Sequence, residues 1–369
     1  MSERKADDRL QELRDRGITI YSISRLDCIN RCLYEAYMTY IQHKTGSPNI
    51  YSSLGGRIHD VLEGITNGTH TEKDLLPAMY AELDDMDMLG IEFPKARDGK
   101  DTIRDNWIAN MKNFCTEYKP PKGDLKAEEL FIYQTPKGRY LQGYIDLQNI
   151  NKDGSISIYD YKTSSLYRGE DIKEHGRQLI VYAMGKEQEG FTVKSASWIF
   201  LKYVTVKFFG KKTAKSKKDS EIIKVIERRN LGRELAPYLE GTLAKAGYDE
   251  FDIEMMIDQV ISTNSIENLP NEVKNQYKIT PYVLSVDLSE EARQECIDYI
   301  DGTIDKWEAL HDESQYLPRK FTKITKTGKE TSDTFFCSAL CPHSKSCFYL
   351  RDYLDTLEDN KNTEEDDLF

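Results

Sequence analysis

Residues 143–162 read GYIDLQNINKDGSISIYDYK, and this stretch decides the fold class. Two β-prone runs are separated by the turn-forming residues 151–154, which predicts a hairpin with Asp146 at the end of one strand and Asp160 in the next. Because side chains alternate along a strand, Asp160 and Lys162 should point to the same face. The stretch therefore predicts two carboxylates and a lysine at one site.

This combination of residues suits the hydrolysis of a phosphodiester bond. That reaction needs a positioned water molecule, charge stabilisation on the phosphate and, usually, divalent cations held by oxygen ligands. Asp146 and Asp160 can hold such a cation. Lys162 can orient or help to deprotonate the attacking water and stabilise the developing negative charge. A D-x-K triplet alone is common on charged strands, so the order of the surrounding elements carries the argument.

Regular elements are expected on both sides of this stretch. The run AEELFIYQT, from Ala127, precedes it, and the three β-prone runs together predict an antiparallel meander. The charged segment 71–118 predicts helices that form an insertion or a lid. Further helices are expected at residues 24–44, 52–66, 171–187 and 289–311, and further strands at 195–203 and 282–286.

Four elements follow one another in an order that resembles the RecB-like branch of the PD-(D/E)xK nuclease superfamily. They are the helical segment Gly56-Arg-Ile-His59-Asp-Val-Leu-Glu63, then Gly143-x-x-Asp146, Asp160-x-Lys162 and Gln178-x-x-x-Tyr182. The resemblance implies an α/β fold with a restriction-endonuclease-like core, in which helices flank a mixed central sheet, and with helical insertions. It also implies a metal-dependent deoxyribonuclease.

The resemblance also assigns roles to individual residues. Mg²⁺ or Mn²⁺ would be bound by Asp146, Asp160, the main-chain carbonyl of Tyr161 and His59, with Lys162 as the catalytic lysine. Gln178 and Tyr182 lie one helical turn apart and would face the site, to contact DNA or to position Lys162. The alternative for these two residues is a helix face that packs on the sheet.

The family comparison favours an exonuclease that acts on single-stranded or frayed DNA ends in recombination, repair or phage DNA metabolism. Two alternatives stay open: a catalytically silent nuclease fold that binds DNA or a partner as an adaptor, and a structure-specific endonuclease. Nothing in the sequence is recognisable as a reader of the RNA 2′-hydroxyl group.

Seven cysteines, with no export signal before them, favour metal or cluster ligation over disulfides. Cys337, Cys341 and Cys347 lie close together in sequence, and Cys32 or Cys28 can supply a fourth ligand. The split set resembles iron-sulfur RecB-like nucleases, including AddB and CRISPR-associated RecB-like exonucleases. The resemblance implies a 4Fe-4S cluster on Cys32 and the three C-terminal cysteines, and it favours Cys32 over Cys28. A structural zinc ion on the same thiols is the alternative.

The net charge of −12 hides two opposite fields. The C-terminus is acidic, whereas six lysines lie between residues 207 and 218. We expect these lysines to contact nucleic acid, and a solvated loop is the alternative. They are Lys207, Lys211, Lys212, Lys215, Lys217 and Lys218. Cys115 and Cys296, in helical contexts, are expected to be buried free thiols.

Residues 1–357 are expected to form one compound nuclease domain, followed by a disordered acidic tail at 358–369. The tail ends in Leu368-Phe369, a tip that could bind a sliding clamp or another replication protein. The sequence shows no signal peptide or membrane span, so a cytoplasmic location in a bacterial or phage-infected cell is expected. Within the domain we expect N-terminal helices (18–66), a helical insertion (67–126), the catalytic core (127–205), additional helices and strands (206–335) and a cluster-binding segment (336–350).

Overall fold

The computed structural model describes the backbone at residues 7–96, 98–211 and 218–366, and the side chains as far as Leu357. At the centre of this part lies a mixed sheet with the strand order β2-β5-β6-β7-β8, in which β9 also pairs with β7. β6 and β7 are parallel and the other neighbouring pairs are antiparallel. The strands are β2 (Asp124–Lys126), β5 (Leu147–Ile150), β6 (Ile156–Lys162), β7 (Val193–Gly210), β8 (Ser220–Glu227) and β9 (Lys278–Ser285). The expected α/β fold class is confirmed.

The expected single meander is divided between two sheets. β3 (Glu129–Gln134) and β4 (Tyr140–Ile145) pair antiparallel in a smaller sheet, where β1 (Ile20–Tyr21) lies parallel to β4. The chain passes from β4 into β5 through Asp146, so the hairpin partner of β6 is β5. The prediction of one meander was wrong because the β-prone run 140–150 is continuous in sequence and does not reveal this junction. Asp146 therefore lies where the two sheets meet.

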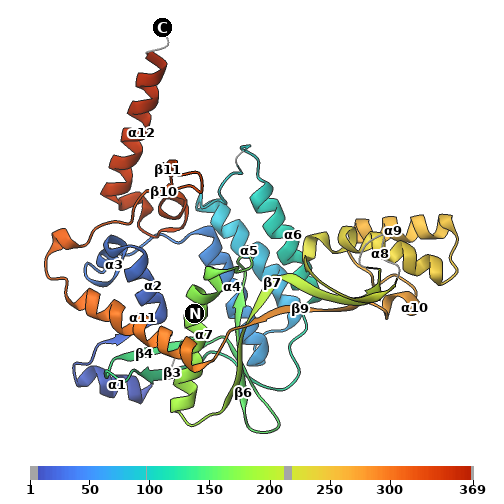
Figure 1. The fold of residues 1–369 in the computed structure, drawn as a ribbon, viewed down its shortest axis with the longest axis horizontal. Helices are drawn as coiled ribbons and strands as arrows, with labels where there is room; N and C mark the ends of the chain where they lie inside the picture. The colour runs from blue at the N-terminus through green and yellow to red at the C-terminus, as the bar shows by residue number, and fades with distance from the viewer. Residues whose placement is uncertain (1–6, 97, 212–217, 367–369) are drawn as a thin grey trace.

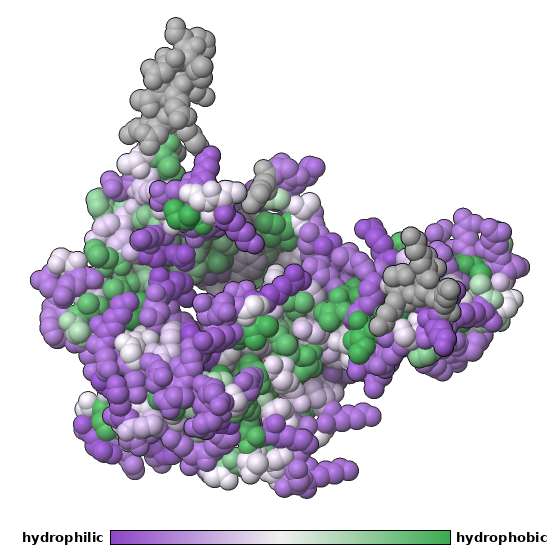
Figure 2. Space-filling view, in the orientation of Figure 1, coloured by the Kyte–Doolittle hydropathy of each residue, from purple (hydrophilic) through white to green (hydrophobic). Residues whose placement is uncertain are grey.

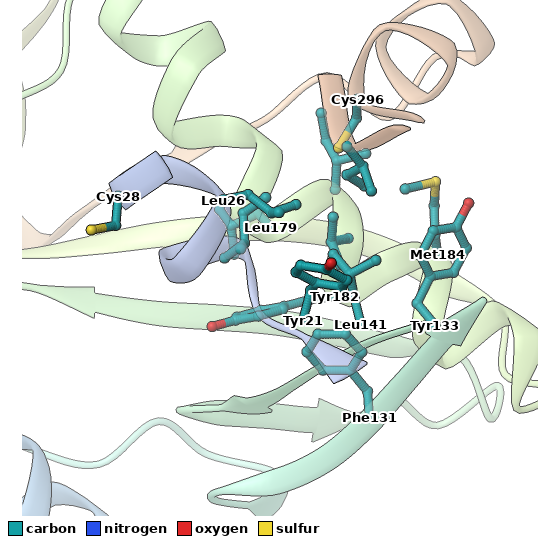
Figure 3. Packing of buried hydrophobic residues seen from close by; sticks show 14 of the residues in the cluster. Tyr21, Leu26, Cys28, Phe131, Tyr133, Leu141, Leu179, Tyr182, Met184 and Cys296 are labelled. Carbon is teal, nitrogen blue, oxygen red and sulfur yellow. The ribbon is translucent and has the colours of Figure 1, made fainter. Parts of the chain in front are cut away.

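Helix α7 (Glu170–Gln188) packs between the two sheets and forms the centre of the largest hydrophobic core. Figure 3 shows Tyr182 of this helix close to Phe131 and Leu141 of the smaller sheet, and Leu179 beside Leu26. Helices α2 (Ile23–Arg31) and α11 (Glu290–Glu308) contact α7 and contribute to the same core. Burying each large apolar side chain stabilises the fold by about 1.5–3 kcal/mol. This core fixes the helix that follows the Asp160-Tyr161-Lys162 strand.

Two glycines allow Phe131 to pack tightly between β4 and α7. A Cβ atom on Gly143 would lie 2.6 Å from the Phe131 ring, and one on Gly185 would lie 2.4 Å from it. We expect Gly143→Ala to lower the free energy of unfolding by about 1–3 kcal/mol in urea denaturation, because the core must shift to admit the methyl group. Gly241→Ala is the control, since a Cβ there meets nothing within 4 Å. Equal stability of the two variants would contradict the packing role.

A helical layer covers the other face of the central sheet. Its helices, α4 (Ile50–Thr66), α5 (Leu75–Met88) and α6 (Thr102–Glu117), share a second core with Leu147, Tyr161, Ile199 and Leu201 of the sheet. The helices expected within residues 71–118 are therefore present. They cover the sheet and do not form a separate lid, because their apolar residues are buried against β5, β6 and β7.

A third part of the fold, here called the arm (residues 203–281), projects from the end of the central sheet (Figure 1). It combines the distal half of β7 with β8, β9 and the helices α8 (Leu231–Lys245), α9 (Glu250–Thr263) and α10 (Asn271–Lys274). One face of these strands and the helices enclose a hydrophobic core of their own. The sequence predicts helices in this region, but not an arm with a separate core.

The expected N-terminal helix at 24–44 is interrupted at Cys32. Its φ of −160° and ψ of 107° are extended, so α2 ends before it and α3 (Leu33–Tyr40) begins after it. The Cys32 sulfur accepts the main-chain N–H of Glu35 at 3.4 Å and so caps α3. Apolar periodicity continues across the break, and for this reason the sequence did not reveal it.

The remaining elements lie at the two ends of the chain. They are α1 (Asp8–Asp15), the hairpin strands β10 (Thr322–Ile324) and β11 (Glu330–Ser332), and α12 (Phe348–Asp366). Helix α12 continues into the segment for which the sequence predicts disorder, as a helix already formed can propagate through Asp, Glu and Asn residues. Leu368 and Phe369 lie outside the described residues. None of the described helices has the length and hydrophobicity that a membrane span requires.

Candidate active site

Asp146 is held at the junction of the two sheets by contacts from two other elements. Its Oδ2 accepts the main-chain N–H of Tyr161 at 2.8 Å and lies 3.3 Å from Nδ1 of His59. His59 is carried by α4, whose first turn is fixed by a capping box between Asn49 and Ser52. The structure therefore brings the histidine helix to the Gly-x-x-Asp segment, about 87 residues further along the chain.

Asp160 and Lys162 lie on the same face of β6, as their spacing predicts. The Asp160 side chain is 2% exposed, and its Oδ2 lies 2.7 Å from Nζ of Lys162. This oxygen makes no hydrogen bond of good geometry within the described part of the chain, so the ion pair alone satisfies it. A buried carboxylate oxygen with a single cationic neighbour retains the capacity to bind a further cation.

Burial and neighbouring charges shift the pKa values of Asp146, His59 and Lys162. Burial raises the pKa of Asp146 well above its usual range, and the nearby charge of Asp160 raises it further. Burial lowers the pKa of His59, so its ring is neutral at neutral pH and can act as a ligand. Burial also disfavours the charge on Lys162, but the attraction of Asp160 outweighs it and raises the pKa of the lysine. Lys162 therefore stays protonated.

A chain of hydrogen bonds extends from Lys162 onto α7. Its Nζ donates to Oε1 of Gln178 at 3.1 Å, and Nε2 of Gln178 donates to the Tyr182 hydroxyl at 2.7 Å. The Tyr182 ring is buried, with its centroid 5.0 Å from that of Phe131. Gln178 and Tyr182 therefore both lie on the side of α7 that faces Lys162, as expected. Gln178 contacts the lysine directly, while Tyr182 reaches it through Gln178 and also packs in the core.

The site contains an acidic residue that the sequence analysis does not single out. Glu128 has a φ of 53°, which is uncommon for a residue other than glycine. Its charge adds to the burial that raises the pKa of Tyr182 and partly opposes the burial that lowers the pKa of His59, so it lies near both residues. The only signal in the sequence is its position just before a β-prone run, which many surface residues share.

A stacked aromatic pair and a polar cavity lie beside the site. Tyr167 and His175 have ring centroids 4.1 Å apart and nearly parallel planes. Burial lowers the pKa of His175, and the nearby charge of Lys162 lowers it further. His175 also lines an open cavity of about 710 Å³, which includes Arg31, Arg177 and Arg319. This cavity provides polar space next to α7, close to the lysine.

The four cysteines assigned by the resemblance line one small cavity. These are Cys32, Cys337, Cys341 and Cys347, and Cys28 is not among the lining residues because its side chain belongs to the main core. Burial raises the pKa of Cys337 to about 11, and the nearby Cys32 and Cys347 also raise it. His343 lines the cavity too, but its Nε2 lies 2.9 Å from the Thr39 hydroxyl. Cys115 and Cys296 are buried elsewhere, as expected.

Across the part of the chain that the structure describes, no group of three or more His, Cys, Asp or Glu side chains is arranged to hold a metal ion. The candidate ligands instead contact other protein groups. His59 pairs with Asp146, and Asp160 pairs with Lys162.

The lysines of this run that the structure describes lie on the arm and not beside the carboxylates. Lys207 belongs to β7, and it is exposed, as are Lys211 and Lys218. Lys212, Lys215 and Lys217 lie outside the described residues. The role in nucleic-acid binding expected for this run stays a prediction.

The fold and the site define an α/β protein whose mixed sheet presents two carboxylates and a lysine between helical layers. A family model of the PD-(D/E)XK nuclease superfamily matches residues 20–348. The chain belongs to this superfamily, which places it among the metal-dependent nucleases that act on DNA with divalent cations such as Mg²⁺ or Mn²⁺. No curated protein matches the sequence.

Proposed function

We propose that the protein is a Mg²⁺- or Mn²⁺-dependent DNA exonuclease that acts on single-stranded or frayed ends. The observation that carries the proposal is the convergence of Asp146, at the junction of β4 and β5, with Asp160 and Lys162 of β6 in a largely buried position. The choice of DNA ends as substrate rests on the RecB-like order of the motifs. Recombination, repair and phage DNA metabolism are the settings that use such an enzyme.

The residues present fit a divalent cation. Asp146 and Asp160 would supply carboxylate oxygens, with the main-chain carbonyl of Tyr161 and the neutral ring of His59 as further ligands. The oxygen Oδ2 of Asp160, which is buried and has no hydrogen bond, supports this assignment. A bound cation would neutralise the two carboxylates and polarise the scissile phosphate. The contacts of His59 with Asp146 and of Lys162 with Asp160 would then be loosened.

Lys162 is the group of this chain that acts on the reacting phosphate. Its ammonium stays protonated, and once it is released from Asp160 it can stabilise the negative charge that develops on the phosphoryl oxygens. It can also hold the attacking water through a hydrogen bond. Gln178 fixes the direction of the ammonium by accepting one of its protons. Tyr182, anchored in the core, holds Gln178 in turn.

The four-cysteine cavity fits a structural 4Fe-4S cluster. Four cysteines line it together with Tyr34, Glu35, His343 and three apolar residues, and four cysteinate ligands are the usual requirement of such a cluster. The N–H of Glu35 points at the Cys32 sulfur, as expected for a residue that is to carry charge. A zinc ion would use the same thiols. In both cases the metal would join α3 to the C-terminal segment and take no part in hydrolysis.

The test of the function compares end-labelled linear single-stranded DNA with closed circular single-stranded DNA. Anaerobically purified protein is supplied with Mg²⁺ or Mn²⁺, and parallel reactions contain EDTA. We expect the linear substrate alone to be degraded, and only without EDTA. Cleavage of closed circles would show that the protein is an endonuclease and not an exonuclease. Binding without cleavage of either substrate would favour the adaptor function.

We expect Gln178→Ala to lower the rate constant of cleavage by about tenfold, because the loss of one hydrogen bond lets the Lys162 ammonium move. Gln178 acts through the lysine, so kcat should fall while KM changes little. Gln188→Ala on the same helix is the control, as its amide bonds the backbone of Gln134, away from the site. A rise in KM with unchanged kcat would instead indicate that Gln178 contacts DNA.

A further inference from the structure

The strands of the arm continue the face of the sheet that carries the active site. Beside Asp160 and Lys162, Trp198 and Phe200 of β7 face α7. Between Phe200 and Val204 the pairing of β7 with β9 shifts, because β7 has extra residues there. Such a bulge changes which residues face each side.

The residues that flank the bulge show the direction of this change. Before the bulge, Ile199 and Leu201 face the α4–α6 layer. Beyond it, Val204 lines a cavity together with these two residues and with Leu231 of the arm helices. Tyr203 instead joins the core on the α7 side. Odd-numbered residues after the bulge therefore lie on the active-site side of the sheet.

This side of the arm exposes a defined set of residues, here called the open face. Lys207 and Phe209 alternate with the buried Val206 and Phe208. By strand register, Ile223 and Lys278 lie on either side of Lys207, and Glu221 lies beside Phe209. Val225 continues the same row of β8. The members of the open face are Thr205, Lys207, Phe209, Glu221, Ile223, Val225 and Lys278.

The open face is unusual for its exposed apolar groups. Phe209 is 66% exposed, Ile223 54% and Val225 43%. The opposite face of the same strands is covered by α8, α9 and α10 through the core of the arm. Most of the surface visible in Figure 2 is hydrophilic, and its hydrophobic residues form separate patches. An exposed aromatic ring with aliphatic neighbours on a sheet is typical of a binding surface.

We propose that the open face is a binding platform for single-stranded DNA, which holds the strand outside the active site during its degradation. The inference rests on the proposed nuclease function and names a second contact for its substrate. Phe209 offers a ring on which a base can stack, and Ile223 and Val225 offer apolar area around it. Lys207 and Lys278 match the phosphate charges, with Lys211 and Lys218 at the tip.

The geometry suits a strand that reaches from the arm to the lysine. Phe200 pairs with Lys162 at the site, and Lys207 lies seven residues further along the same strand. At about 3.3 Å per residue, the two positions are at most roughly 23 Å apart. A substrate must therefore be several nucleotides long to occupy both positions, and an oligonucleotide of three nucleotides is too short to do so.

The test measures binding of fluorescent oligo(dT) of 30 and of 3 nucleotides in EDTA, so that no cleavage interferes. We expect Phe209→Ala to raise the Kd of the 30-mer about tenfold through the loss of stacking. The double variant Lys207→Gln/Lys278→Gln should reduce the slope of log K against log salt by about 1.4, since each phosphate contact on single strands contributes about 0.7. The 3-mer cannot bridge the two positions, so its affinity should differ far less among the variants.

Phe251→Ala is the matched control, because this phenylalanine is 74% exposed on α9 in the same arm but beside acidic residues. It should leave both affinities unchanged. Wild-type affinity of the open-face variants for the 30-mer would overturn the proposal. The proposal would also be overturned if the open-face substitutions lowered the affinity for a blunt duplex as much as for the 30-mer, because a duplex cannot stack its bases on Phe209.

Cleavage of the 3-mer with Mg²⁺ or Mn²⁺ separates the two proposals. Open-face variants should cleave it at the wild-type rate, because none of the substituted residues lies at the carboxylates. If the wild type cleaves neither oligonucleotide but the open-face variants still lose the 30-mer, the exonuclease proposal fails and the platform stands. If the wild type cleaves DNA but the open-face substitutions do not change its binding, the exonuclease proposal stands and the platform proposal fails.

Discussion

Lys162→Ala is expected to lower the rate of DNA cleavage by about 10²- to 10³-fold, the usual cost of removing one preorganised charge from a transition state. The substitution removes the ammonium that contacts both Asp160 and Gln178. Single-turnover degradation of end-labelled linear DNA measures the effect on the chemical step. Affinity for DNA in EDTA should change far less than the rate.

The same substitution leaves the carboxylate of Asp160 buried without its cationic partner. Removing one member of a buried ion pair costs about 3–5 kcal/mol of stability, so the fold of the variant must be confirmed by circular dichroism and thermal melting. Lys162→Met is a second variant that keeps the apolar stem. Lys186→Ala is the control, as this buried lysine of α7 pairs with Glu189, away from the site. A folded Lys162 variant with wild-type activity would rule out the catalytic role.

Cys32→Ser is expected to abolish the visible absorbance of an iron-sulfur cluster and to lower the stability on the order of 5 kcal/mol. As a cluster ligand the sulfur would join α3 to a segment about 300 residues later, and a cross-link that closes so long a loop removes much of the entropy of the unfolded chain. Metal analysis of anaerobically purified protein and thermal melting measure the two effects. DNA cleavage by the remaining folded protein should be unaffected in its chemical step.

Cys28→Ser is the matched control because Cys28 lies one helical turn before Cys32 but belongs to the main core. It should retain iron and lose only the stability that its burial provides. Loss of iron from the Cys28 variant, with retention in the Cys32 variant, would reverse the assignment. Zinc in a colourless wild-type sample would show that the four cysteines bind a structural zinc ion and not an iron-sulfur cluster.

The residues of the candidate site could be predicted because their chemistry depends on local spacing. Asp160 and Lys162 share a face through strand alternation, and Gln178 and Tyr182 share one through the helical repeat. These relations hold in the structure, where each pair lies as its spacing requires. Glu128 escaped prediction because its approach to the site depends on the turn before β3 and not on a periodic pattern.

The strands and helices around the site were predicted, but not their assembly. The β-prone run 140–150 contains no signal that β4 and β5 belong to different sheets, because Asp146 interrupts it by a single residue. Similarly, Cys32 breaks a helix in a segment whose apolar residues keep their helical spacing. Tyr161 and His59 contact Asp146, and the main-chain N–H of Tyr34, directly after the Cys32 break, donates to the carbonyl of Leu317. Contacts between residues far apart in the sequence cannot be predicted from the local sequence pattern.

The sequence by itself determined the α/β class, the carboxylates and lysine, and the grouping of the cysteines, since each follows from residue type and short-range spacing. Only the tertiary structure decided that Cys32 and not Cys28 lines the four-cysteine cavity and that helices 71–118 cover the sheet. It also decided that a bulge in β7 turns Phe209 to the same side as Lys162. These outcomes depend on which surfaces pack together, and packing is settled by the whole chain.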